Sequence, residues 1–400
     1  MDIVKVYQPD YYKNFYCTGN ECRNNCCNHW SIDIDKGTYD KYMNLPDELK
    51  EEFTKKLTPI DDGIGGAKTV IDPNGNCSFL DEKGLCTIQL RLGHEYLSIV
   101  CRRYPRITCI VDGAPERFLE LSCEVAAKLI LFEKKFMNFV ELEIDTDKDN
   151  SLCEYGRYYY NKGLNTSKYT KNENGVQIFW KLRVTSMAIL QSRKYKVRFR
   201  MLLLCMFIQD VNDYFITGRD SEVINLAEVY LARIEDSFFN ELYEQIPAGT
   251  PRESEVMIEI LKEMYINRGF LFRQSVDFAL NAFNIQANNW ILPEGFIKNL
   301  SKYYKDYFSD KEYIFENYLV HRVLSEGFPF NYKGEADVLS NYIDLLAKYN
   351  IIEFLLTGIC RSNMKFDKKR IIDCVAIFTR SYEHSTVKYL QPEDLRRQNS

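Results

Sequence analysis

The N-terminal part of the chain opens with a dense run of cysteines. Residues 17–27 are Cys17-Thr18-Gly19-Asn20-Glu21-Cys22-Arg23-Asn24-Asn25-Cys26-Cys27. This block places four thiols within eleven residues, and its Gly and Asn residues suit an irregular loop in which several side chains can converge. The stretch therefore predicts an irregular, metal-stabilised module at the start of the fold.

A second block of cysteines follows, so that nine of the thirteen lie in the first 123 residues. An odd total fits a disulfide framework poorly, and clustered thiols in a reducing compartment are more often metal ligands or reactive groups. Soft thiolates favour zinc, Cu(I) or iron–sulfur clusters over hard cations. Nine cysteines exceed one site, so two sites, or one site with structural thiols packed as small buried hydrophobes, both remain open.

Eight of these cysteines are the candidate metal ligands, and both blocks contribute to them. They are Cys17, Cys22, Cys26, Cys27, Cys77, Cys86, Cys101 and Cys123. An iron–sulfur cluster and a zinc site each take about four thiolates, so spacing alone does not choose between them. We expect sulfur atoms from positions 22, 26, 86 and 101 to meet around one inorganic centre.

Composition and charge restrict the classes of partner and the cellular location that the protein can have. The chain has 400 residues, 46% of them hydrophobic, and 52 basic against 57 acidic side chains leave a net charge of −5. This acidic balance argues against nucleic acid as the main partner. The start of the chain lacks a signal-peptide core, and the longest apolar run, Met201–Ile208, is far shorter than the roughly 20 residues of a membrane span. We therefore expect a cytoplasmic protein that binds no membrane.

Hydrophobic periodicity predicts a mainly α fold. Residues 1–140 should form an irregular Cys-rich metal-binding domain, 141–175 a polar linker or surface excursion, and 176–400 an α-helical domain on which the first domain packs. A helix over 38–57 should be split by Pro46. A short hairpin over 107–121 should precede a helix over 123–139. The helices expected in the body span 176–191, 197–213, 221–246, 253–283, 294–308, 311–325, 335–357 and 367–384.

A short basic segment precedes one of these helices. It contains Arg193, Lys194, Lys196, Arg198 and Arg200. Such a run is usually a solvated helix start, and a docking patch for an acidic protein is the alternative.

The cysteine motifs resemble a known family. The Cys17/Cys22/Cys26-Cys27 block, Cys77-x-Phe79-Leu80-(x)3-Gly84-x-Cys86-x-Ile88 and Cys101-Arg102-x-Tyr104-Pro105-Arg106 are similar to the zinc/iron-chelating Cys-rich domains. A longer pattern resembles the flagellin lysine-N-methylases. It includes Glu116-Arg117-x-Leu119-x-Leu121-Ser122-Cys123, Glu316-Asn317-Tyr318-Leu319, Phe328-Pro329-Phe330 and Phe378-Thr379-Arg380-x-x-Glu383-His384. One segment departs from that family, because Ser-Cys-Pro-Glu-Ala-Ala-Arg is here Ser122-Cys123-Glu124-Val125-Ala126-Ala127-Lys128.

The resemblance implies a chemistry that the residues alone do not establish. It implies methylation of the lysine ε-amine on flagellin, with S-adenosylmethionine as donor and a 4Fe-4S iron–sulfur cluster held by the N-terminal cysteines. No strand–G-x-G-x-x-G–helix unit is present, so a Rossmann-type methyltransferase is not expected. The alternatives are a zinc- or iron-chelating protein without catalysis and a zinc-stapled helical interaction protein.

Two further groups of residues are candidates within that function. Glu383, His384 and Arg380 could supply a base or a clamp for the donor's carboxylate, against the alternative of a surface salt bridge. Arg102, Arg103 and Arg106 lie beside Cys101 and could balance the negative charge of thiolates and sulfides, against the alternative of simple exposure. We therefore assign the first group as catalytic and the second as cofactor-binding.

Overall fold

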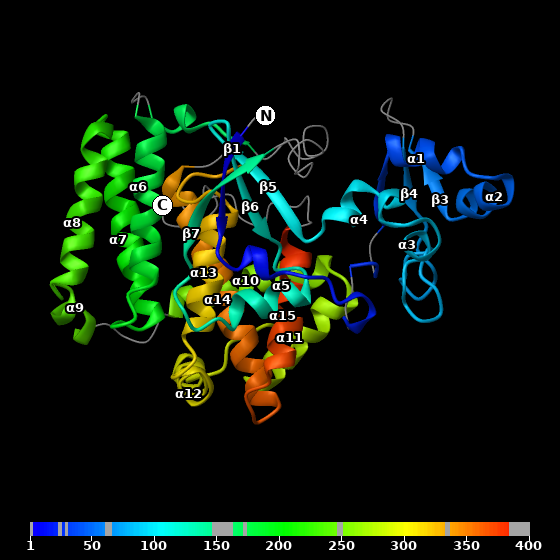
Figure 1. The fold of residues 1–400 in the computed structure, drawn as a ribbon. Coiled ribbons are helices and arrows are strands. Elements are labelled where there is room, and N and C mark those ends of the chain that lie inside the picture. The colour runs from blue at the N-terminus through cyan, green and yellow to red at the C-terminus, as the bar shows by residue number, and fades with distance from the viewer. Residues whose placement is uncertain are drawn as a thin grey trace.

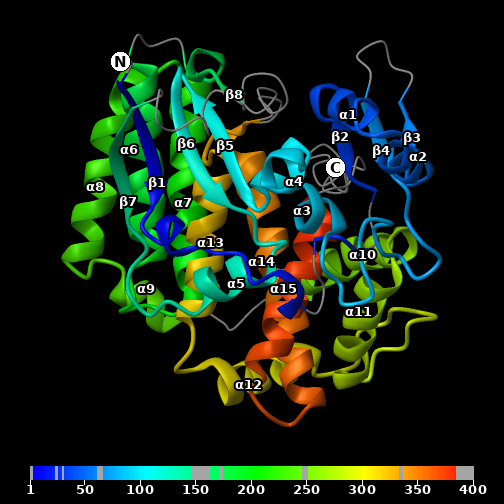
Figure 2. The same ribbon diagram turned by 45° about the vertical axis from the view of Figure 1, so that its right-hand side comes forward.

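A computed structural model shows a small N-terminal module beside a mixed sheet and a large helical body (Figure 1). The structure describes residues 3–22, 26–28, 31–60, 66–145, 163–170, 174–245, 251–332 and 337–383. The module lies at one end of the molecule, away from α6, α7 and α8, and both views agree on this (Figure 2). The mainly α fold class expected from periodicity is confirmed.

A five-stranded sheet combines strands from the beginning and the end of residues 3–164. Its strands are β1 (Ile3–Pro9), β5 (Arg106–Val111), β6 (Ala114–Leu119), β7 (Phe139–Asp145) and β8 (Gly163–Leu164), in the order β7-β1-β6-β5-β8. Strand β1 is antiparallel to β7 and parallel to β6. Residues 141–145, which we placed in a polar linker or surface excursion, are thus the last five residues of β7.

The hairpin between β5 and β6 is confirmed, with a tighter turn than expected. Its turn is Asp112-Gly113, with φ of 45° and 90°, which matches the Asp-Gly preference of two-residue hairpin turns. Pro115 is inside β6 and pairs with Ile110. The hairpin orients Glu116 inward, where it forms a fully buried ion pair with Arg183 at 2.8 Å.

The helical body surrounds one long central helix. It comprises α6 (Gly175–Leu190), α7 (Val197–Ile216), α8 (Val223–Glu235), α9 (Asn240–Gln245), α10 (Pro251–Asn267), α11 (Phe270–Ala282), α12 (Phe296–Phe308), α13 (Tyr313–Ser325), α14 (Val338–Ser362) and α15 (Lys368–Glu383). Helix α14 is buried on nearly all of its faces, as expected of a helix at the centre of a bundle. In the described part of the chain, no helix has the length and apolarity needed to span a bilayer.

The expected helices lie near their observed places, with three differences. The helix expected over 221–246 ends at Glu235, and Ser237 has a φ of 59° before α9 begins. The helix expected over 253–283 breaks between Asn267 and Phe270, where Gly269 is the N-cap of α11. The helix expected over 123–139 is only α5 (Glu124–Leu131), because the chain turns back to enter β7.

The N-terminal module has its own small core. It contains α1 (Lys36–Met43), α2 (Asp47–Lys55), α3 (Thr87–Leu92) and α4 (Ile99–Arg103), with a three-stranded sheet of β2 (Asp33–Asp35), β4 (Gly66–Thr69) and β3 (Leu57–Pro59). Pro46 is the N-cap of α2, so the predicted break is confirmed. Tyr42, Phe53 and Phe79 are fully buried at the centre of this core.

Three arginines of the basic segment 193–200 form ion pairs inside the molecule. Arg193 and Arg200 both form ion pairs with Glu316 on α13, at 2.7 Å each. Arg198 pairs with Glu353 on α14, and its Nε donates to that carboxylate at 2.9 Å. These cations are therefore used inside the molecule, where they hold the start of α7 against α13 and α14.

Candidate functional site

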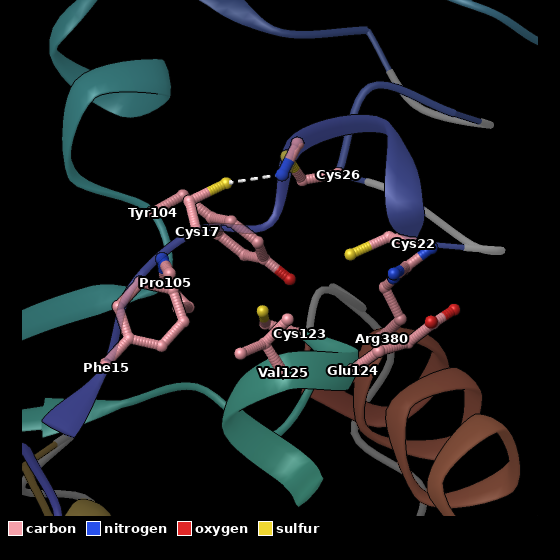
Figure 3. Close-up of a pocket in the computed structure, with 11 residues that line it drawn as sticks. Phe15, Cys17, Cys22, Cys26, Tyr104, Pro105, Cys123, Glu124, Val125 and Arg380 are labelled. Atoms are coloured by element: carbon pink, nitrogen blue, oxygen red, sulfur yellow. Dashed lines mark hydrogen bonds between the residues drawn. The ribbon is translucent and has the colours of Figure 1, made fainter. Parts of the chain in front are cut away.

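Four of the predicted cysteine ligands face one pocket. Cys17, Cys22, Cys26 and Cys123 line a space of about 380 Å³, counted with the solvent at its mouth. The rest of the lining is Phe15, Gly19, Tyr104, Pro105, Glu124, Val125 and Arg380 (Figure 3). These residues are up to 365 positions apart in the sequence (380 − 15), so the pocket is assembled by the tertiary fold.

Local structure sets the position of each thiol. Cys17 precedes and Cys22 follows the short 3-10 helix η2 (Gly19–Glu21), and both sulfurs form hydrogen bonds within this loop. The Gly19 N–H donates to the Cys17 sulfur at 3.4 Å, and the Cys22 sulfur lies 3.5 Å from the Thr18 hydroxyl. Cys123 is the N-cap of α5, so its sulfur lies where the unpaired N–H groups of a helix start favour negative charge.

The thiols of the pocket differ in acidity. The hydrogen bond from Cys27 lowers the pKa of Cys26 to about 7, and the nearby charge of Arg380 acts in the same direction against burial. Burial raises the pKa of Cys123 to about 12, although N–H groups of α5 oppose that rise. Burial also raises the pKa of Cys22. Of Cys22, Cys26 and Cys123, only Cys26 has a lowered pKa, so its thiolate form is favoured.

The other four predicted ligands belong to the small core of the N-terminal module. Cys77 is buried, and Cys27, Cys86 and Cys101 pack against that core. The Cys77 N–H donates to the Cys27 carbonyl at 2.8 Å, which joins the two cysteine blocks. Burial raises the pKa of Cys101 to about 12. We call these four thiols the inner set and the four in the pocket the pocket set.

The two sets are adjacent through the Cys26–Cys27 peptide bond. The charge of Cys26 raises the pKa of Cys86 and of Cys101, so the sets lie within electrostatic range of each other. The expected meeting of positions 22, 26, 86 and 101 at one centre stays a prediction; Cys22 and Cys26 line the pocket, and Cys86 and Cys101 pack on the inner core. Among the residues that the structure describes, no group of three or more His, Cys, Asp or Glu side chains is placed to hold a metal ion.

The thiols of the pocket set can be compared with the ligands that a metal cofactor requires. Among the described residues, none of its four thiols is tied up in a disulfide. A tetrahedral zinc ion needs its four sulfurs about 3.8 Å apart, given a Zn–S bond of about 2.3 Å. A cluster of several iron atoms separates its thiolates more widely and takes four cysteine ligands. The pocket set offers the donor type and number that a cluster takes, while the described residues are not arranged around a metal position.

The predicted cofactor-binding arginines lie around the pocket rather than in it. Arg106 Nη2 donates to the Phe15 carbonyl at 3.1 Å, and its guanidinium stacks on the Phe15 ring at 4.7 Å. Arg106 thereby supports a wall of the pocket. Arg103 is 8% exposed, and neither Arg102 nor Arg103 is among the lining residues. Their role in binding a cofactor stays a prediction.

One member of the predicted catalytic group reaches the pocket. Arg380 rises from the last turn of α15 and donates from Nη2 to the Ser122 carbonyl at 3.0 Å (Figure 3). Glu383 is the last residue of α15, and His384 lies outside the described residues. The structure thus joins Arg380 to the pocket set and leaves the roles of Glu383 and His384 as predictions.

Sequence reasoning missed three residues at this site. Tyr104 and Glu124 line the pocket, and buried Ser122 lies directly behind it. A signal for Tyr104 was available, because it stands between Cys101 and Pro105 in the family motif. The Ser122 hydroxyl bonds to Glu120 and Tyr104, and the N-cap position of α5 is taken by Cys123.

Comparisons with known proteins agree with the resemblance. The family model described as the FliB lysine N-methylase C-terminal domain matches residues 183–399, more than half of the chain. Lysine-N-methylases of Salmonella choleraesuis (strain SC-B67) and Salmonella typhimurium (strain LT2) are each 30% identical over 147 residues. Each alignment covers 36% of this chain and 37% of the relative, so it spans little more than a third of their length.

A further relative aligns over most of its own length. The flagellar biosynthetic protein FliU of Salmonella muenchen is 30% identical over 134 residues, which is 32% of this chain and 79% of FliU. No solved structure matches the chain.

Proposed function

The chain belongs to the FliB lysine N-methylase family, and from this premise we propose that it is a protein-lysine N-methyltransferase. The observation that carries the proposal is the makeup of the pocket. Arg380 lies in the region matched by the family model, and it meets four thiols that come from the N-terminal module and α5. The two parts of the chain therefore build one site.

The proposal extends to a substrate, a methyl donor and a cofactor. We propose that lysine side chains of flagellin accept the methyl group and that S-adenosylmethionine donates it. Support for flagellin comes from the FliB family name and from a flagellar biosynthetic protein among the relatives. We place the enzyme in the cytoplasm, where a reducing environment would keep its many thiols reduced.

The pocket set is the proposed ligand set for a 4Fe-4S cluster. Cys17, Cys22, Cys26 and Cys123 supply the number and type of donor that such a cluster takes. Arg380 carries a positive charge beside them, which offsets the negative charge of thiolates and sulfides. When bound, a cluster would supply electron-transfer chemistry for activating the methyl donor.

The protein's own residues must prepare the acceptor lysine. A lysine ammonium has a reference pKa near 10.4 and is not nucleophilic until it loses a proton. An apolar surface that excludes water lowers that pKa. Phe15, Pro105 and Val125 provide such a surface in the pocket. The proposed base is Glu383, the last residue of the helix that carries Arg380, or His384, which follows it in the sequence.

The direct test is methyl transfer to purified flagellin monomer. Protein purified without oxygen is incubated with S-adenosylmethionine and a reductant, and lysine methylation is measured by mass spectrometry. We expect methylated lysines with the wild type and none with Cys22→Ala. Unmodified flagellin in the presence of enzyme with a full iron complement would contradict the enzyme proposal and favour a metal-chelating protein.

A further inference from the structure

One surface of the helical body is strongly basic. It is formed by α12, by the turn between α14 and α15, and by the segment that follows α5. Residues 361–370 alone carry five cations and one carboxylate, although the whole chain has a net charge of −5. Both views place α12 and the turn between α14 and α15 together at the lower end of the molecule (Figure 1, Figure 2). We call this surface the basic face and define it by six cations: Lys134, Lys302, Arg361, Lys365, Lys368 and Lys369.

Aromatic rings bring the separate segments of the basic face together. The Phe366 ring, in the turn before α15, lies 6.4 Å from the Phe132 ring after α5 and 5.7 Å from the Phe308 ring of α12. Lys368 Nζ lies 4.3 Å from the centroid of Phe132. Segments more than 230 residues apart in the sequence therefore share one surface (366 − 132 = 234).

A second ring holds two further cations. The Arg361 guanidinium, at the end of α14, lies 4.7 Å from the centroid of Tyr303 on α12, and Lys302 Nζ lies 6.0 Å from the same centroid. Contacts of this kind fix the stem of a cation on a ring and leave its charge near the surface. The basic face is thus organised by the fold and is not a run of independent side chains.

Most of its positive charge is not neutralised within the structure. Asp367 lies 3.8 Å from Arg370, so this carboxylate is paired. The hydrogen bond from Lys311 lowers the pKa of Asp310, and the charge of Lys134 acts in the same direction, which places Lys134 on this surface. Three exposed lysines form no ion pair with the residues that the structure describes: Lys365, Lys368 and Lys369.

Two helices connect the basic face to the pocket. Helix α5 begins at the pocket with Cys123 as its N-cap, ends next to Phe132 and packs against α15. Lys369 and Arg380 are 11 residues apart on α15, which is close to three full turns, so they lie on the same side of this helix about 17 Å apart. An extended peptide covers that distance with about five residues.

We propose that the basic face binds an acidic segment of the protein whose lysine is methylated. The inference rests on the proposed function and adds a docking surface to it, with the acceptor lysine about five or more residues away from the acidic segment. Charge complementarity supports a protein partner. A nucleic acid fits less well, because its continuous phosphate backbone would meet the carboxylates Asp306, Asp310 and Asp367 within this surface.

Binding of an acidic peptide tests the basic face independently of methylation. Full-length holoenzyme purified without oxygen is titrated with a fluorescent peptide of about six glutamates, and the dissociation constant is measured by anisotropy at low ionic strength. The variant carries Lys365→Glu, Lys368→Glu and Lys369→Glu. We expect it to bind the peptide about 10-fold more weakly than the wild type, because three attractive charges become repulsive.

A control variant has the same change in net charge at other exposed positions, on α2 and α10. It carries Lys50→Glu, Lys55→Glu and Lys262→Glu. It should bind the peptide like the wild type. Equal affinity of the two variants would overturn the proposal, since the effect would then come from net charge alone. An oligonucleotide of equal charge that bound more tightly than the peptide, and lost this affinity only in the first variant, would overturn the choice of an acidic protein.

Methylation of flagellin supplies a second measurement. In the first variant KM for flagellin should rise about 10-fold while kcat stays near the wild-type value, because the basic face does not touch the reacting groups. Iron content and melting temperature show whether the fold and cofactor are retained. An unchanged KM in a protein that methylates flagellin would overturn the docking surface and leave the proposed function in place. Peptide binding by the basic face without methylation of flagellin would do the opposite.

Discussion

The pocket set and the inner set each contain four cysteines, but the two sets lie in different surroundings. The pocket set lies in an open space with Arg380, Tyr104 and Glu124, and Cys17 is exposed. The inner set packs on Phe53, Phe79 and Tyr42, and Cys77 is buried. A ligand can approach the pocket set, whereas the inner set packs against a hydrophobic core, with Cys77 buried and its other three thiols partly buried. The surroundings of the thiols, rather than the number of cysteines, indicate which thiols are available to bind a cofactor.

The largest effect should follow loss of a pocket thiol. Cys22→Ala should lower methyl transfer to flagellin at least 100-fold, because the proposed cofactor would lose a ligand. The change should leave the free energy of unfolding of the helical body nearly unaltered, since Cys22 is only half-buried in a loop. Methylation rates measured by mass spectrometry, beside a thermal unfolding curve, check both expectations.

The matched control for this variant is Cys205→Ala. Cys205 is also half-buried but lies on α7 in the helical body. Its removal should preserve methyl transfer. If both variants lost activity equally, the special status of the pocket set would be refuted.

A smaller effect should follow loss of an inner thiol. Cys77→Ala removes a side chain that is 6% exposed, and we expect a loss of about 1–3 kcal/mol in the free energy of unfolding. Iron per folded chain should stay at the wild-type value. A loss of part of the iron in Cys77→Ala would instead indicate that the inner set is a second metal centre, and it would contradict the distinction between the two sets.

The last prediction concerns acid stability at a buried histidine. His321 is buried, its Nδ1 lies 2.8 Å from the Tyr11 hydroxyl, and burial lowers its pKa to about 3. The unfolded chain binds this proton more tightly, with a pKa near 6.5. Stability should therefore fall by up to about 1.4 kcal/mol per pH unit as pH drops from about 6.5 towards 3.

The variant His321→Gln should flatten that dependence. Glutamine can still bond to Tyr11 but does not titrate, so the slope of unfolding free energy against pH should decrease in this window. Chemical denaturation at a series of pH values measures the slope. Identical slopes in wild type and variant would show that His321 does not control acid stability.

Local patterns were enough to predict much of the fold. Pro46 was expected to divide a helix and does so, because it begins α2. The hairpin and the body helices also follow from local turn chemistry and from apolar spacing. The five-stranded sheet could not be predicted in this way, since Ile3 of β1 pairs with Asp145, far along the chain.

The candidate site was predictable in its residue types and not in its grouping. Sequence spacing pointed to the eight cysteines, and the family resemblance pointed to Arg380, but neither could divide the thiols between two environments. Adjacent Cys26 and Cys27 belong to different sets, which only the tertiary structure reveals. Tyr104 and Ser122 were missed because their importance comes from hydrogen bonds to partners such as Arg380, 258 residues away from Ser122.

Iron and acid-labile sulfide analysis of cysteine variants purified without oxygen tests the central claim most directly. The claim is that the pocket set, and not the inner set, holds the cofactor. We predict that Cys123→Ala loses iron and sulfide together while Cys77→Ala keeps both at the wild-type ratio per chain. Full iron and sulfide in Cys123→Ala, or their loss from Cys77→Ala alone, would contradict the account.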